Sequence, residues 1–292
     1  MEGSLQRAPE TVQRRPCRGC GRLNAAYAAS CAGCSRPLQR SSRPAAPLLR
    51  GPDETEQGTN PWFVLGIGAV LAPALGLLPV LQYVGWFLAS LVHEIGHCVV
   101  AWSFGAPAYP AIRIDGHAAA IHGEQRLWLV ALIWLFLAAM AWNARRRPRL
   151  RTVLIVLLVL HPILAFTKGH DVLHLLAGHL AELAFAGLAF HRAFSGGFTD
   201  STAERITYAT VAWFLLGKNV VMNIGLLTSE TARQAYLGNG SFGLEQDFIR
   251  AARAMGWSLE GVGLLMLLVS IGVIPTVWGI RQLARAPSQD AA

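Results

Sequence analysis

The sequence predicts an all-α polytopic membrane protein, with about six or seven transmembrane helices and a short membrane-associated β-hairpin behind a small N-terminal module. Of its 292 residues, 53% are hydrophobic and only 14% are charged. From Trp62 onward, apolar runs approach or exceed the roughly 20 residues that a helix needs to cross a bilayer. The 60 residues before that point are polar and rich in Arg, Pro and Ser. This pattern excludes an ordinary soluble domain.

The N-terminal module carries two CxxC pairs, CRGC and CAGC. Thiolates at this spacing can close a tetrahedron around one zinc ion, so we expect a structural zinc bound by Cys17, Cys20, Cys31 and Cys34. Two disulfides in an oxidising compartment are the alternative. Reduced thiolates favour a cytoplasmic location for this module. It resembles the short zinc ribbons at the ends of many bacterial membrane proteins, which implies a docking or regulatory role with a protein partner.

The composition along the chain predicts three parts: a four-cysteine zinc ribbon at 1–36, a flexible linker at 37–60 and a transmembrane domain at 61–285. The linker is rich in Pro, Arg and Ser. The net charge of +8 comes mostly from arginine in the tail and loops. Because no basic stripe with interleaved aromatic residues occurs, we expect contact with a lipid bilayer and no nucleic-acid partner.

The apolar runs place the helices in order. Residues 62–104 fit two helices with a tight turn, and further spans are expected at 127–142, 152–166, 168–194, 208–227 and 261–280. Between the first two helices and the next span, residues 109–122 predict two short strands around Asp115-Gly116, a strong two-residue hairpin turn. Residues 228–258 are expected to be exposed and to contain a short amphipathic helix with Phe248 on its apolar face.

The number of crossings stays open at this stage. Arginines cluster at 145–151 and again at Arg281 and Arg285, and such clusters favour the cytoplasmic side. Seven full crossings from a cytoplasmic N-terminus would place both clusters outside. If residues 62–104 make only one net crossing, through a re-entrant piece, both arginine clusters are cytoplasmic. Seven spans from an external N-terminus would also make both clusters cytoplasmic.

The stretch LASLVHEIGHCVVAW places His93, Glu94 and His97 inside an apolar helix. Residues four apart lie on one helical face, so both imidazoles can bind one zinc ion. Glu94 is rotated away from that pair and can act as general base toward a zinc-bound water. Ionisable groups within a membrane span are costly and indicate function. A satisfied polar cluster between helices is the alternative interpretation.

An HExGH sequence on a hydrophobic helix resembles the site-2 protease family of intramembrane zinc metalloproteases. The resemblance covers about residues 62–227 and depends chiefly on this one motif. It implies that Glu94 is catalytic, that His93 and His97 bind zinc, and that the substrate is a membrane protein cut in or near a transmembrane segment. It also implies that the strands at 109–122 pair with an unwound substrate strand.

The third zinc ligand is not given by the family's usual NxxPxxxxDG motif, which this chain lacks. The segment GHDVLHLLAGHLAEL offers Asp171, or alternatively His174, on a polar helical face. Four more polar residues in apolar surroundings would support the ligands by hydrogen bonding or contact substrate. They are Glu182, His179, Asn219 and Asn223.

Two rival functions follow from the same residues. HEIGH and HDVLH are both HxxxH, a pattern that resembles membrane di-iron enzymes that modify lipids, although the adjacent HH pairs of those enzymes are absent. The second rival is a catalytically inactive scaffold that works through its zinc ribbon. In each case we expect an integral protein of the bacterial cell membrane.

Overall fold

The computed structural model forms two compact units, Met1–Arg50 and Gly51–Ala292. The boundary falls inside the linker predicted at 37–60, most of which lies outside the described residues, as does the turn predicted at Asp115-Gly116. The structure describes residues 14–17, 19–25, 28, 30–35, 59–114, 118–195, 201–238 and 245–285.

The first unit contains one small antiparallel sheet. Strands β1 (Arg14–Pro16) and β2 (Leu23–Ala25) pair so that Arg15 lies opposite Asn24. The first CxxC pair lies between these strands and the second follows them. The sheet therefore holds the two CxxC loops together, as a zinc ribbon requires.

Helices make up most of the second unit, and six of them are long and apolar enough to cross a membrane. The prediction of a mainly helical chain with about six such helices is thus confirmed. In chain order the elements are α1 (Pro61–Leu71), α2 (Ala74–Leu77), α3 (Pro79–Ser103), β3 (Ala108–Ile112), β4 (Ala118–His122), α4 (Leu127–Asn143), α5 (Pro148–Ala165), α6 (Gly169–Ser195), α7 (Thr202–Thr228), α8 (Glu230–Gly238), α9 (Asp247–Met255) and α10 (Leu259–Arg285).

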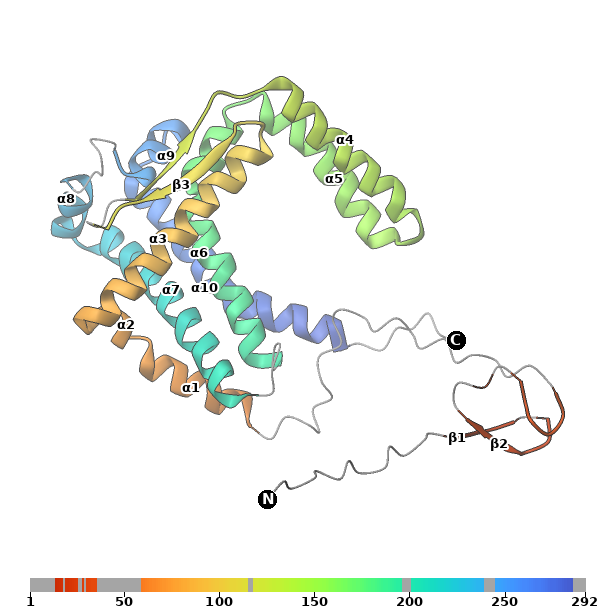
Figure 1. Ribbon diagram of the computed structural model, residues 1–292. Helices are drawn as coiled ribbons and strands as arrows, with labels where there is room; N and C mark the ends of the chain where they lie inside the picture. The colour runs from red at the N-terminus through yellow and green to blue at the C-terminus, as the bar shows by residue number, and fades with distance from the viewer. Residues whose placement is uncertain are drawn as a thin grey trace, which may run out of the picture. The chain divides into compact units, whose positions relative to one another are not determined.

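Helix α6 is the centre of this unit, and α3, α7, α9 and α10 all pack against it (Figure 1). Its contact with α3 is very close at Gly96, where a Cβ atom would lie 2.4 Å from the backbone oxygen of Ala177. A glycine at a helix interface allows such a close approach of the two backbones. The shared core of α6, α7, α9 and α10 is filled by large side chains, among them Phe190, Phe194, Leu215, Phe248 and Met266.

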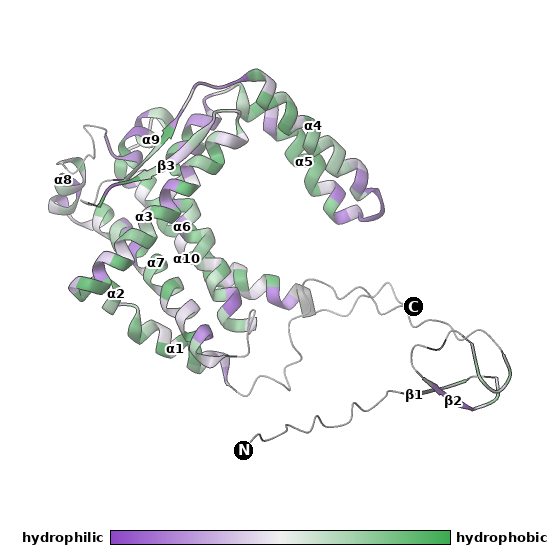
Figure 2. Cartoon of the chain, viewed as in Figure 1, coloured by the Kyte–Doolittle hydropathy of each residue, from purple (hydrophilic) through white to green (hydrophobic). Residues whose placement is uncertain are grey.

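Helices α4 and α5 form a hairpin that packs mainly on itself (Figure 1). In Figure 2 both helices are mainly hydrophobic, and the turn that joins them is hydrophilic. That turn carries the arginine cluster at 145–151. An all-round apolar helix that is little buried in protein is typical of contact with lipid.

Helices α1 and α2 together are shorter than a full span. Thr59, just before α1, has its hydroxyl 2.8 Å from that of Thr202, the first residue of α7. Arg205 donates to the carbonyl oxygens of both Thr59 and Ala193. The chain therefore enters the bundle at the end where α6 stops and α7 starts.

The predicted pair of short strands is confirmed. Strands β3 and β4 are antiparallel, with Ala108 opposite His122 and Pro110 opposite Ala120. The hairpin packs on the C-terminal part of α3, where the Trp102 indole donates to the carbonyl of Ala108. This contact places the hairpin next to the HEIGH motif.

Candidate metal centre

The imidazoles of His93 and His97 lie one turn apart on α3, with their Nε2 atoms 3.1 Å from each other. The Nδ1–H of His93 donates to Glu182 over 3.0 Å, and the Nδ1–H of His97 donates to the carbonyl oxygen of His174 over 2.7 Å. Metal-binding histidines usually give their second N–H to a carboxylate or a backbone carbonyl, which fixes the ring and its tautomer. Both Nε2 atoms are thereby left with a lone pair for a metal.

Asp247 supplies the third group. Its Oδ2 atom lies 3.2 Å from the Nε2 of His93 and 3.0 Å from the Nε2 of His97. Asp247 is the first residue of α9, and the next residue, Phe248, is fully buried against His179 and Tyr236. The packing of Phe248 therefore holds the carboxylate of Asp247 over the two imidazoles.

The spacing of these three atoms suits a tetrahedral metal ion. Atoms about 3.1 Å apart form one face of a tetrahedron whose centre is about 1.9 Å from each, close to the 2.0–2.2 Å of zinc bonds to nitrogen and oxygen. The fourth corner is left for water or substrate. Burial acts to raise the pKa of Asp247, but the contacts with His93 and His97 outweigh burial and hold that pKa well below its usual range. The carboxylate is thus ionised, as a metal ligand must be.

Neither residue that the sequence offered as third ligand lies in this group. The Asp171 side chain is 60% exposed and its carboxylate lies 3.2 Å from His170. The ring of His174 lies tilted against that of His97 and edge-to-face with that of His122, with centroids 5.0 and 4.9 Å away. The contribution of His174 to the group is its backbone carbonyl. Asp247 therefore takes the position for which Asp171 or His174 was expected.

Glu182 is held by a network that spans α3, α6 and α7. Its Oε1 accepts from His93 and, over 2.8 Å, from the ammonium of Lys218; its Oε2 accepts from Asn219 over 2.7 Å. Glu182 has no exposed surface. The network explains why a lysine and a glutamate can both lie within apolar spans, since each neutralises the other.

His93, His179 and Glu182 form a second group with atoms close enough to hold a metal ion. Donors already occupy both oxygens of Glu182, and one of them is the cation Lys218. The Nδ1 of His93 is also committed to Glu182. We therefore interpret this group as the support that orients His93, with His179 hydrogen-bonded to Asn219 over 3.0 Å.

The two asparagines of α7 are fully buried. Asn219 belongs to the Glu182 network, and Asn223 donates to the backbone carbonyl of Asn219 over 2.8 Å. Hydrogen bonding within and between helices, the alternative weighed from the sequence, accounts for these contacts better than binding of a substrate backbone.

Glu94 is buried but lines the cavity that also contains the three metal-binding atoms. The carboxylate of Glu94 accepts a hydrogen bond from the backbone N–H of Ala120 on β4. The cavity has a volume of about 510 Å³ and is bounded by α3, α6, α7, β4 and the segment leading into α9. This volume is ample for a water molecule and several residues of an extended peptide.

Gly178 is required by the position of His93. A Cβ atom at Gly178 would lie 2.3 Å from the Nε2 of His93, so Gly178→Ala should displace the ring and abolish metal binding at this centre. Overpacking of this kind costs about 1–3 kcal/mol of folding free energy. Gly217→Ala is the control, because its Cβ would have no neighbour within 4 Å. Metal content and thermal unfolding measure both effects; wild-type metal binding by Gly178→Ala would contradict the arrangement.

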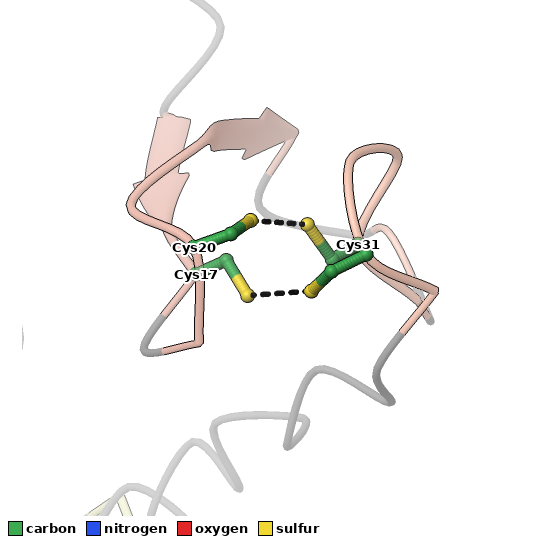
Figure 3. Close-up of side chains that lie close together, drawn as sticks. Cys17, Cys20 and Cys31 are labelled. Atoms are coloured by element: carbon green, nitrogen blue, oxygen red, sulfur yellow. Dashed lines mark hydrogen bonds between the residues drawn. The ribbon is translucent and has the colours of Figure 1, made fainter.

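The four cysteines of the ribbon also converge (Figure 3). The sulfur of Cys17 lies 3.6 Å from that of Cys34, and Cys20 lies 3.5 Å from Cys31. These distances far exceed a disulfide bond and approach the roughly 3.8 Å sulfur separation of a tetrahedral zinc–thiolate site. A hydrogen bond from the Gly33 backbone helps to lower the pKa of Cys31 to about 6. The group fits a structural metal, as the spacing predicted.

Sequence reasoning missed Asp247, although it predicted the amphipathic helix that carries it. An acidic residue in the first turn of a helix has an ordinary explanation, because it stabilises the helix dipole. One feature of the sequence could have indicated Asp247: it directly precedes Phe248 on the apolar face of that helix. A carboxylate at that position lies next to the face that packs against the core.

Comparison with known proteins adds no relative: no family model matches the chain, and neither a curated protein nor a solved structure is significantly similar to it.

Proposed function

We propose that this protein is an intramembrane zinc metalloprotease that hydrolyses a peptide bond in or near a transmembrane segment of another membrane protein. The observation that carries the proposal is the group His93, His97 and Asp247, three ligand atoms 3.0–3.2 Å apart with a cavity on their open side. Three protein ligands and one open position are the pattern of catalytic zinc, whereas structural zinc sites are closed.

A zinc ion at this centre would supply Lewis acidity and lower the pKa of a water in the open position to about 7. The chain's own residues do the rest. Glu94 lines the same cavity and can accept a proton from that water and return it to the departing amine. Glu182, anchored by Lys218 and Asn219, keeps the His93 ring in place during the reaction.

Strand β4 offers a binding edge for the substrate. Pro110 has no N–H, so its pair with Ala120 is a non-hydrogen-bonded one, and the N–H and C=O of Ala120 point away from β3. By alternation, the same holds for Ala118 and His122. All three line the cavity. The Ala120 N–H bonds to Glu94, so an unwound substrate segment could add as a strand along β4 through the backbone groups of Ala118 and His122, beside Glu94.

Substituting the support of His93 should weaken metal binding without removing a ligand. Glu182→Gln keeps the size of the side chain but loses the charge that faces His93 and Lys218. Loss of such a support typically lowers metal affinity by about 10- to 100-fold. Competition with a chromogenic zinc chelator measures the change. Glu124→Gln, in a neighbouring cavity, is the control and should bind as the wild type does.

Sequencing of new protein N-termini tests the proposed function. Membranes from cells producing the wild type should contain fragments that begin in or beside transmembrane segments, and membranes from cells producing His97→Ala should lack them. Identical sets of fragments would contradict a protease. Bound iron with oxygen-dependent changes in lipids would instead indicate the di-iron oxidoreductase, and metal in the ribbon alone would indicate a scaffold.

A further inference from the structure

The six span-length helices alternate between two ends of the bundle. At one end lie Thr59, the α4–α5 turn, the α6–α7 connection and the end of α10. The end of α10 is placed there by Arg281, whose guanidinium lies 5.2 Å from the ring centre of Phe194, near the end of α6. We call this the arginine-rich end.

The opposite end of the bundle is also fixed by contacts. His161 near the end of α5 bonds to the carbonyl of Ser103 at the end of α3, over 2.8 Å. Gln125, just before α4, donates to the carbonyls of Phe104 and Ala165. The β3–β4 hairpin, the α5–α6 turn, α8 and α9 therefore belong to this end, which we call the hairpin end.

The metal centre lies toward the hairpin end. His97 is six residues before the end of α3, about 9 Å along the helix axis. Asp247 comes from α9, which is outside the span-length helices. The cavity is bounded on this side by Tyr236, Glu245 and Arg250.

Positive charge is divided unequally between the two ends. Of the 25 lysines and arginines, Lys218 lies within α7 and six belong to the hairpin end: Arg113, Arg126, Lys168, Arg233, Arg250 and Arg253. Nine belong to the arginine-rich end: five at 145–151, and Arg192, Arg205, Arg281 and Arg285. The remaining nine are in residues 1–60. Residues 1–60 contain no apolar run that could cross a membrane before Thr59.

We infer that the arginine-rich end is cytoplasmic and that the metal centre opens to the extracytoplasmic face of the membrane. Excess Lys and Arg in short loops sets the orientation of membrane proteins, and within the second unit nine such residues at the arginine-rich end against six at the hairpin end favour this orientation. Residues 61–103 then make one net crossing, which reconciles both arginine clusters. The centre takes its metal ion, and under the proposed function its peptide segment, from the extracytoplasmic side, and Asp247 closes the site from that side.

Two single-cysteine substitutions test the orientation in intact cells. Glu245→Cys places a thiol at the rim of the cavity, and Asn143→Cys places one on an exposed position beside the α4–α5 turn. A membrane-impermeant charged maleimide should label Glu245→Cys in intact cells and label Asn143→Cys only after the cells are permeabilised. Peptide mapping by mass spectrometry shows whether the label is at position 143, at position 245 or on a cysteine of the wild type, of which Cys20 and Cys34 are exposed and Cys98 is buried. Only label at positions 143 and 245 is counted.

Labelling of Asn143→Cys but not of Glu245→Cys in intact cells would overturn the inference. Labelling of both variants in intact cells, or of neither, would also overturn it. Labelling of both variants in permeabilised cells shows that each is produced and its thiol is reactive. The readout needs no catalysis. A failure of the proposed protease activity would therefore leave the labelling result unchanged, and the two failures can be told apart.

Discussion

Replacing Asp247 with alanine should remove the metal from the centre and abolish its activity. The carboxylate is one of three groups that meet at 3.0–3.2 Å, so its loss leaves two imidazoles and no charge to offset that of a divalent cation. Loss of a group that only supports a ligand already lowers affinity by about 10- to 100-fold, so loss of the ligand should exceed that range. Elemental analysis of the purified protein and chelator competition measure the effect.

Asp171→Ala is the matched control for this variant. Both residues are aspartates, each lies beside a histidine, and the sequence alone favoured Asp171. Its carboxylate is more than half exposed and pairs with His170. The Asp171 variant should keep wild-type metal content. If instead Asp171→Ala lost the metal and Asp247→Ala kept it, the assignment of the third ligand would be reversed.

Glu94→Gln should retain the metal and lose cleavage. Glutamine matches the shape of glutamate but cannot accept a proton, and removal of a general base costs about 100- to 10,000-fold in rate. Because Glu94 makes no bond within the three-ligand group, metal content should stay at the wild-type level. The appearance of new N-termini in membranes, compared with that of the wild type, measures the rate.

The result for Glu94 separates the candidate functions. Loss of both metal and cleavage would make Glu94 a ligand and not a base. Unchanged cleavage would exclude Glu94 from the chemistry. If the protein is a lipid-modifying oxidoreductase, the oxidation of lipids by Glu94→Gln should follow its iron content. Oxidation should continue if the variant keeps iron and stop if it loses iron.

Much of the centre could be predicted because its signals are local. His93 and His97 are four residues apart on a helix, and helical geometry alone places both rings on one face. Gly96 and Gly178 mark close contacts, as small residues in apolar helices often do. The supporting role of Glu182 was also predictable, since a carboxylate inside a span needs a partner.

The third ligand could not be predicted in this way because it depends on tertiary structure. Asp247 is 150 residues from His97, and the contact exists because Phe248 packs against His179 and Tyr236. Asp171 has the expected residue type on the expected helix, but it lies two turns before Gly178, beyond the reach of His93. Helical spacing predicts which residues share a face and not which helix lies opposite.

The orientation of the chain needed the structure for a similar reason. The sequence gives the arginine clusters, but the number of crossings in residues 61–103 depends on how α1 and α2 pack. The contact of Thr59 with Thr202 and that of Ser103 with His161 place the start of α1 and the end of α3 at opposite ends of the bundle. An apolar run of 43 residues alone fits one crossing or two.

The metal content of the full-length wild type and of a His93→Ala/His97→Ala variant tests the central claim most directly. The account predicts two equivalents of zinc per wild-type chain, one in the ribbon and one at the centre, and a loss of one equivalent in the variant. Equal metal content in the two proteins would contradict a metal centre formed by His93, His97 and Asp247.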